Sequence, residues 1–475
     1  MHTEAKNIFL RRFARSILWL AVFSLIFATV ESVAQPAVVI ENVTLIDGTG
    51  SAPVADATVV LDNGVIARIA TGATARTLRK PRGATVVDAR GKFLIPGMMD
   101  MHIHLLGGGA WRDSSAQSDK PVDPDTGLRT LQGYLYYGFT SVYDAGNNPD
   151  FILSLRERER RNEIVAPRIF ATGQLLSYPG SWSVGYAGIG VRDWPGTIDD
   201  LELQVARKPD IQKITYEAMG VGPNPLVRQL PRELMRQMID YLHARGVRTT
   251  AHISNERMAR DAIDAGIDTL AHAPATGVIT QDFAELVAAK KIPVQTSLAV
   301  FDEIRALKDG VDFLRTPEYR AVVDPREPAV REQARQRYLK LGWPDWFAAI
   351  YPYALRNVKR IHDAGGILVL ATDRTLAPAA LRELELVVES GIPPLAALRI
   401  ATLNAAAFLG RERDLGSIEL GKIADVVLLE ADPRVDIRNV RKVVRVWKGG
   451  VEIDRTRLDL PINTPSIAAY QSPSP

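Results

Sequence analysis

The spacing of hydrophobic and polar residues changes twice along the chain. Residues 35–95 alternate in short runs typical of β-strands, as in AVVIENVTLIDG, and Asn63-Gly64 separates two apolar runs. Because Asn-Gly accepts the positive φ angles of a tight turn, this dipeptide predicts a β-hairpin. The alternation returns in residues 411–460, as in VRKVVRVWKGGVEI. We expect the two flanking segments to pair into one small β-sandwich domain.

The segment between them, residues 96–410, alternates short apolar runs with helical stretches that often end in Gly. Strands that alternate with helices form βα units, and eight units in succession are typical of an α/β fold of the (β/α)8 TIM-barrel type. A doubly wound open sheet is the alternative, but no glycine-rich phosphate fingerprint follows any of the runs. The eight runs are FLIPGMMDMHIHL, GFTSVYDAG, PRIFATGQLLS, DIQKITYE, GVRTTAHIS, GIDTLAHAP, KIPVQTSLAV and GGILVLATD.

Residues 1–34 have the pattern of a secretory signal peptide. A basic start is followed by an apolar run over residues 17–30 and by the small residues Ser32 and Ala34. This pattern predicts cleavage before Gln35 and export, to a periplasm, with no stable membrane span afterwards. An uncleaved membrane anchor is the alternative, and Arg11-Arg12 leaves the twin-arginine route open beside the general one.

Composition and charge restrict the classes of partner. Loss of residues 1–34 removes four basic and two acidic residues, so the formal net charge falls from +3 to +1. A surface this balanced gives no electrostatic case for nucleic acid or an anionic membrane. The chain contains no Cys, which excludes disulfides and thiolate metal sites. We expect a small-molecule substrate, leave a homo-oligomer open, and expect the Pro- and Ser-rich tail, residues 461–475, to be disordered.

Six residues that can bind metals stand near the ends of predicted strands. His102 and His104 lie two residues apart on one strand, so their side chains leave the same face. In a parallel barrel the strand ends converge on one mouth, where active sites are built. Lys213 lies inside a short apolar strand, where an ammonium is costly unless it is paired or chemically changed. The other candidates are His252, His272 and Asp373.

These residues resemble those of the metal-dependent amidohydrolase superfamily, and the resemblance covers nearly all of the chain after residue 34. LIPGMMDMHIHL resembles the first-strand signature, in which the two histidines bind the more buried metal. With TLNAAAFLG and WKGG, the order of motifs is most similar to the branch of imidazolonepropionase-like and Xaa-Pro dipeptidase-like enzymes. The resemblance implies that CO2 carboxylates Lys213, that the carbamate bridges two divalent ions, and that His252 and His272 hold the second one.

The chemistry expected of this site is hydrolysis of an amide or cyclic amide. Imidazole and carboxylate ligands suit zinc or a similar divalent ion. A water between two such ions ionises near neutral pH and attacks the substrate carbonyl. We expect Asp373 to be the general base and acid, taking the proton of the water and delivering it to the leaving amine, with a plain ligand role as the alternative. Asp100, on the same strand face as His102, is expected to support a ligand from behind.

Other functions on the same fold stay open. A mononuclear deaminase-like hydrolase would not need Lys213 as a ligand, and a lactone or ester hydrolase would use the same ions. A non-catalytic binding relative would be expected to have lost ligands, whereas this chain has all six. The sequence also differs from the dipeptidases, because no tyrosine closely follows His272. It differs from many other relatives because Arg374 and Thr375 follow Asp373.

The long segment between the seventh and eighth strands, residues 301–366, predicts extra helices over the barrel mouth. It is rich in aromatic residues, and the loop after the third strand adds more. We expect some of them to line a partly apolar substrate pocket, although packing of the inserted helices would explain them equally well. The pocket candidates are Trp182, Tyr186 and Trp346.

Overall fold

The computed structural model describes residues 36–105, 122–181, 183–184, 187–218, 226–310, 317–323 and 327–463. The predicted signal peptide, the tail beyond residue 463, Trp182 and Tyr186 lie outside the described residues. Within the described part, no helix combines the length and the apolar character needed to cross a membrane.

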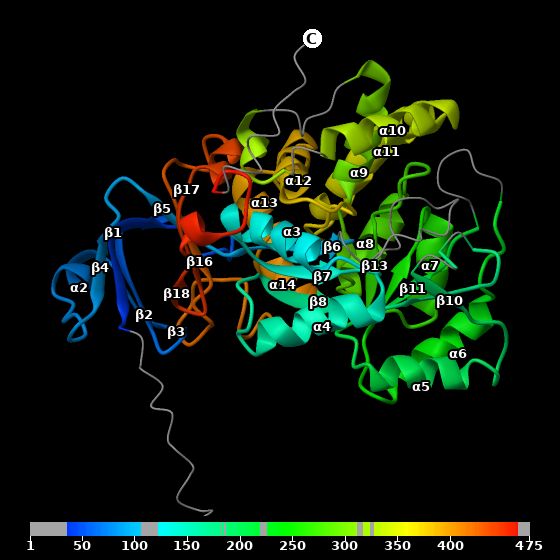
Figure 1. Ribbon diagram of the computed structural model, residues 1–475, viewed down its shortest axis with the longest axis horizontal. Helices are drawn as coiled ribbons and strands as arrows, with labels where there is room; N and C mark the ends of the chain where they lie inside the picture. The colour runs from blue at the N-terminus through cyan, green and yellow to red at the C-terminus, as the bar shows by residue number, and fades with distance from the viewer. Residues whose placement is uncertain are drawn as a thin grey trace, which may run out of the picture. The chain divides into compact units, whose positions relative to one another are not determined.

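An eight-stranded sheet joins the two flanking segments of the chain. Its order is β18-β17-β16-β5-β1-β2-β3, with β4 beside β1. Strand β16 runs antiparallel to β5, with Val427 opposite Ile95, so the red and blue strands of Figure 1 lie side by side. The predicted pairing of the flanks is therefore confirmed, while a sandwich domain stays a prediction. The strands are β1 (Val38–Leu45), β2 (Val54–Asp62), β3 (Val65–Ala70), β4 (Thr85–Asp88), β5 (Phe93–Pro96), β16 (Val426–Leu429), β17 (Val443–Lys448) and β18 (Val451–Glu452).

The predicted hairpin is present between β2 and β3. The two strands pair antiparallel, and both turn residues have the positive φ expected, 50° at Asn63 and 81° at Gly64. One face of the sheet buries its own apolar cluster, which includes Ile40, Val59 and Trp447. The short helix α2 (Gly72–Arg76) follows β3.

The middle of the chain is an α/β structure of parallel strands. Each of the eight predicted runs contains a strand, and these strands form two sheets, ordered β6-β7-β8 and β10-β9-β11-β12-β13-β14-β15. The short strands β9 and β10 come from the loop after β8. The strands are β6 (Met98–Ile103), β7 (Phe139–Asp144), β8 (Arg168–Ala171), β9 (Leu175–Ser177), β10 (Gly188–Gly190), β11 (Gln212–Thr215), β12 (Thr249–His252), β13 (Thr269–Ala271), β14 (Val294–Gln295) and β15 (Leu368–Val369).

Backbone hydrogen bonds also connect these two sheets. Met101 N donates to Leu370 O at 2.9 Å, and Asp210 N donates to Ala171 O at 3.0 Å. The first bond brings the strand of His102 beside the eighth strand, and the second brings β8 beside the strand of Lys213. Because the strands are divided between two sheets, a fully closed barrel stays a prediction.

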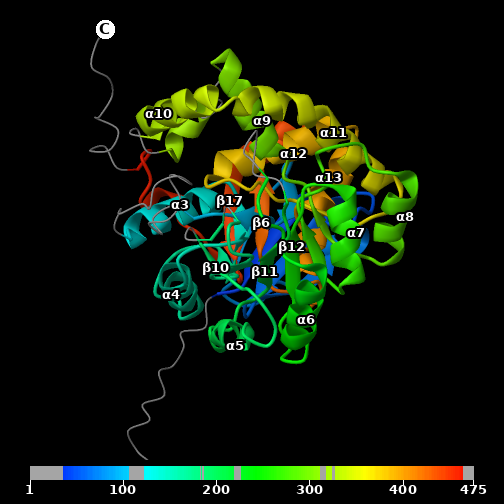
Figure 2. The ribbon, with the colours of Figure 1, turned by 90° about the vertical axis from the view of Figure 1, so that its right-hand side faces the viewer.

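Helices follow the parallel strands and lie outside them, as α6, α7 and α8 do around β11 and β12 in Figure 2. Polar caps begin several of them: Asp123, Asn148, Asn255 and Thr280 accept hydrogen bonds from the first-turn N–H groups of α3, α4, α7 and α8. The helices are α3 (Pro124–Tyr136), α4 (Pro149–Arg160), α5 (Ile198–Ala206), α6 (Arg232–His243), α7 (Glu256–Asp264), α8 (Gln281–Ala289), α12 (Ala377–Glu389), α13 (Pro394–Ile400) and α14 (Leu403–Leu409).

The segment between β14 and β15 contains the extra helices that its length predicted. They are α9 (Leu298–Ala306), η1 (Leu307–Asp309), η3 (Pro317–Ala321), α10 (Glu327–Lys340) and α11 (Trp343–Asp363). The rings of Phe301 and Phe347 pack α9 on α11, 5.5 Å apart. Trp346 is partly buried, and its ring lies 5.0 Å from that of Phe347. Phe347 neighbours Trp346 on the same helix, and Trp346 also packs against the main apolar cluster. This packing accounts for Trp346, and its role in a substrate pocket stays a prediction.

Two ion pairs attach the eight-stranded sheet to the parallel strands. Arg168 on β8 binds Asp425 through two hydrogen bonds of 3.0 and 3.1 Å. Lys448 on β17 donates to Glu159 on α4 at 2.5 Å and to Ala166 O at 2.8 Å. Because Asp425 and Glu159 are buried, loss of either partner leaves an uncompensated charge.

Candidate metal centre

The two histidines of the first parallel strand have fixed tautomers. His102 Nδ1 lies 2.6 Å from Gln295 Oε1, while Gln295 Nε2 donates to Met101 O at 2.6 Å. Since the amide nitrogen takes the backbone carbonyl, the amide oxygen faces Nδ1, which must carry the proton. His104 Nδ1 donates in the same way to Gly146 O at 2.8 Å. In the neutral form of each ring, Nε2 therefore carries the lone pair.

Both lone pairs face the carboxylate of Asp373. His102 Nε2 lies 3.4 Å and His104 Nε2 lies 3.2 Å from Asp373 Oδ1. Burial, and then the charge of Lys213, hold the pKa of His102 well below its usual value, so this ring is neutral near pH 7. Lys213 Nζ also lies 2.7 Å from His102 Nε2, so this lone pair can bind either the amine or a metal ion. Two imidazole nitrogens and a carboxylate oxygen are donors that a divalent ion accepts together. The donor set therefore fits a divalent ion.

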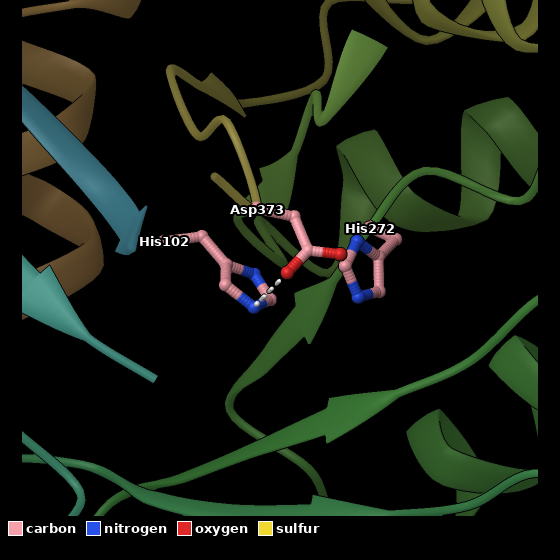
Figure 3. Close-up of side chains that lie close together, drawn as sticks. All are labelled: His102, His272 and Asp373. Carbon is pink, nitrogen blue, oxygen red and sulfur yellow. Dashed lines mark ion pairs between the residues drawn. The ribbon is translucent and has the colours of Figure 1, made fainter. Parts of the chain in front are cut away.

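His272 brings a third element to the same point, as Figure 3 shows. The ligand atoms of His102, His272 and Asp373 all lie within 4.8 Å of one another, which no other group of three such residues in the described part of the chain achieves. The rings of His102 and His272 are 4.7 Å apart. Burial lowers the pKa of His272 well below its usual value, which favours the neutral form that binds metals.

Strained backbone aims these side chains. His272, Ser297 and Asp373, which follow β13, β14 and β15, have φ angles of 81°, 49° and 53°. Non-glycine residues in this left-handed region cost on the order of 1–3 kcal/mol each and concentrate at functional sites. Asp373 N donates to His102 O at 2.8 Å, which holds the strained residue beside the strand of the histidines.

Lys213 is buried, as its place in an apolar strand predicted, and its side chain lies against the first histidine. Its side chain is 2% exposed, and Nζ lies 2.7 Å from His102 Nε2. Its backbone N donates to Thr172 Oγ1 at 2.8 Å. Burial lowers the pKa of Lys213 to about 8, although Asp373 and Asp144 oppose the shift. A larger fraction of this amine is therefore neutral near pH 7 than for an exposed lysine.

His252 lies one step further out, beside His272. Their rings are 4.8 Å apart and nearly perpendicular. His252 Nε2 lies 3.3 Å from Oε2 of Glu217, a carboxylate that is only 4% exposed. The structure therefore brings His102, His104, Lys213, His272 and Asp373 into one set of direct contacts, which His252 joins through the ring of His272.

Asp100 holds the backbone behind the site. It is fully buried and accepts from His102 N at 3.2 Å, Thr372 N at 3.1 Å and Thr372 Oγ1 at 2.9 Å. Burial raises its pKa to about 7, although hydrogen bonds from Thr372 and His102 oppose the shift. Asp100 thus ties β6 to the residue before Asp373 through the backbone, and its support of a ligand stays a prediction.

Sequence reasoning missed several residues around the site. Gln295 fixes the His102 ring, and Glu217 contacts His252. Gln295 lies in an apolar strand and Glu217 lies shortly after one. A polar residue at such a position is a signal that could have identified both. Arg374 pairs with Glu303 on α9, with Nε 2.7 Å from Oε2, which gives the unusual residue after Asp373 a partner. The carbonyl of Gly146 left no signal, because every residue has one.

Comparison with known proteins gives the family. Residues 93–453 match the Amidohydrolase family. An imidazolonepropionase of Treponema denticola is 24% identical over 418 residues, which cover 82% of this chain and 90% of that protein. The structure of molinate hydrolase has a TM-score of 0.72 at 21% identity and covers 93% of this chain and 99% of its own. A Xaa-Pro dipeptidase with bound methionine in the active site has a TM-score of 0.69 at 23% identity, covering 88% and 99%. The chain therefore belongs to the amidohydrolase family and is a hydrolase that acts on carbon–nitrogen bonds.

Proposed function

We propose that the protein is an exported, metal-dependent hydrolase that cleaves an amide or cyclic amide in a small molecule. It uses two divalent ions, and zinc is the expected metal. One observation carries the proposal: Nε2 of His102 and Nε2 of His104 lie 3.4 and 3.2 Å from the carboxylate of Asp373, which makes these three residues a donor set that suits a divalent ion. One ion would be held by these three residues and the other by His252 and His272, with Lys213 between them on a completed (β/α)8 barrel.

Lys213 would serve as the bridge after reaction with CO2. The neutral Nζ attacks the carbon of CO2, a nitrogen–carbon bond forms, and one proton is released, which leaves an anionic carbamate with two oxygens. Burial supports this proposal, because an ammonium at this depth next to two cations is unfavourable whereas an anion between them is not.

Asp373 would move the proton during hydrolysis. Divalent ions in this site supply polarisation of the substrate carbonyl and a lower pKa for water. The carboxylate of Asp373 accepts the proton of the attacking water and then gives it to the leaving nitrogen as the carbon–nitrogen bond breaks. Its side chain is 23% exposed, whereas His102 beside it is completely buried, so the carboxylate can reach both a buried ligand and the solvent side.

The proposed substrate is a small molecule that contains an amide bond. The relatives' names include an imidazolonepropionase, a molinate hydrolase and a Xaa-Pro dipeptidase, which supports a small amide without choosing one. Trp346, with Trp182 and Tyr186, would give the pocket a partly apolar wall. A raised KM in the Trp346→Ala variant with unchanged kcat would support that wall, and unchanged kinetics would leave Trp346 as helix packing.

A metal-exchange experiment with a substrate panel tests the proposed function. The panel contains N-acyl amino acids, dipeptides, cyclic amides and lactones. We expect turnover of at least one amide class, loss of turnover after chelation and dialysis, and recovery when Zn²⁺ is added back. Turnover that persists in protein with no detectable metal would contradict metal dependence. Turnover of lactones alone would instead favour the ester-hydrolase alternative.

A mononuclear site is the second candidate, because the tightest group of ligand atoms contains only His102, His272 and Asp373. This arrangement would hold a single ion and would leave Lys213 as an unmodified amine. Metal analysis distinguishes the candidates directly, since the first predicts two ions per chain and the second predicts one.

Export rests on the signal-like pattern of residues 1–34. N-terminal sequencing of the protein from its native host tests it, with Gln35 expected as the first residue. A chain that retains Met1 in the cytoplasm would contradict it.

A further inference from the structure

Glu217 is a buried carboxylate that the proposed reaction does not use. It follows β11, four residues after Lys213, and is only 4% exposed. Burial of a carboxylate is unfavourable unless defined hydrogen-bond donors or charges compensate it. Ala218 N, Ser254 Oγ and the ring of His252 contribute to this compensation.

These contacts fix the direction of the carboxylate. Oε1 accepts from Ala218 N at 2.9 Å and from Ser254 Oγ at 3.2 Å. Oε2 is thereby directed at His252 Nε2, 3.3 Å away. Because a carboxylate only accepts hydrogen bonds, Nε2 of His252 must carry the proton, and a neutral His252 has its lone pair on Nδ1.

We infer that Glu217 is a positioning residue for the metal ligand His252, holding the ring and its tautomer so that Nδ1 is the atom offered to the ion. The inference rests on the proposed function, since it takes His252 to be a ligand of the second ion. A carboxylate that accepts from the other nitrogen of a ligating imidazole both orients the ring and strengthens it as a donor.

The same contact couples two strands of the site. Glu217 follows the strand of Lys213, and Tyr216 N donates to His252 O at 3.1 Å, so the ends of β11 and β12 are joined by backbone and side chain together. His102 and His104 take their support from Gln295 and Gly146 instead. Loss of Glu217 should therefore weaken the second ion selectively.

A direct ligand role for Glu217 is the competing explanation, because two ligands of one ion also lie about 3.3 Å apart. Two observations oppose it. Oε1 already accepts from two donors, and the closely spaced group of ligand atoms in the described residues is His102, His272 and Asp373, without Glu217.

The test is zinc binding to the metal-free full chain, with no substrate present. Wild type, Glu217→Gln and Glu217→Ala are titrated with Zn²⁺ against a competing chelator, and the number and affinity of the sites are measured. We expect two sites in wild type, a second site weakened about 10-fold in the Gln variant and about 100-fold in the Ala variant, and an unchanged first site. Gln keeps an oxygen acceptor but loses the charge, so it should rescue part of the loss.

The matched control is Glu159→Gln, which removes the charge of another buried carboxylate, one that lies on α4 and pairs with Lys448 of β17. It should leave both zinc affinities unchanged. Wild type that binds fewer than two zinc ions at saturation would overturn the proposed function itself. Two equally tight sites in wild type and in both Glu217 variants would overturn only the inference, as would a zinc-loaded structure with Glu217 bound to the ion. If the Ala variant fails to fold, the Gln variant decides between these outcomes.

Discussion

The Lys213→Ala variant should fold but should lose metal and activity. Loss of a residue that only supports a ligand costs about 10–100-fold in metal affinity or activity, so loss of a bridging ligand should cost at least two orders of magnitude. Metal content per chain and kcat are the measurements. Short carboxylic acids added to this variant should restore part of the turnover, because they can occupy the vacated bridge.

The fold should survive because Lys213 opposes folding of the metal-free protein. Burial lowers its pKa from 10.5 to about 8, which corresponds to about 3 kcal/mol against the buried ammonium. Since the folded pKa is the lower one, this cost is fully present below pH 8 and vanishes above pH 10.5. The variant removes the cost, and the cavity that it leaves offsets part of the gain.

Lys448 offers a matched control, since it is another mostly buried lysine that lies on the eight-stranded sheet and pairs with Glu159. Lys448→Ala breaks a buried pair and should lower the free energy of unfolding by about 3 kcal/mol while metal content stays normal. Lys213→Ala is therefore expected to lose metal without losing stability, whereas Lys448→Ala is expected to lose stability without losing metal. One metal per chain and an unmodified Lys213 in wild type saturated with metal and bicarbonate would reject the bridge, and would leave the lysine as an ammonium paired with Asp373.

The strand positions of the site were predictable because they follow from local pattern. An HxH pair on a strand places His102 and His104 on one face whatever surrounds it, and both indeed face Asp373. The hairpin at Asn63-Gly64 was predictable for the same reason, because the dipeptide itself favours the turn that joins β2 and β3. Where the position of a side chain depended only on the spacing of neighbouring residues, the sequence was sufficient to place it.

The supporting contacts were not predictable, because they join distant parts of the chain. Gln295 lies 193 residues from the His102 ring that it orients, and the local sequence KIPVQTS does not indicate which residue Gln295 contacts. The left-handed backbone at Asp373 occurs together with its hydrogen bond to His102 O, a contact with a residue far away in the sequence. The aromatic residues of the inserted helices were ambiguous for a related reason, since composition does not distinguish a pocket wall from the packing against the apolar cluster seen at Trp346.

The Asp373→Asn variant should lose most of its activity while it keeps most of its metal. Although burial opposes it, positive charge beside the carboxylate, on protonated His102 and His104 or on a divalent ion bound in place of their protons, holds the pKa of Asp373 well below its usual value. The carboxylate is then ionised and able to accept a proton at neutral pH. Loss of a positioned general base and acid lowers kcat by about 10²–10⁴-fold. An amide oxygen can still contact the ion, but an amide cannot take the proton of the attacking water.

The metal content of the same variant separates proton transfer from a plain ligand role. If Asp373 moves the proton, kcat falls while the imidazoles of His102, His104 and His272 continue to hold the ions. If Asp373 is only a ligand, metal content and kcat should fall together, and excess zinc should restore both. Asp425→Asn is the control, because it removes a buried carboxylate that pairs with Arg168 away from the site and should lower stability without changing metal content or kcat. Recovery of wild-type kcat by zinc in Asp373→Asn would therefore remove Asp373 from the proton path and leave the attacking water to another base.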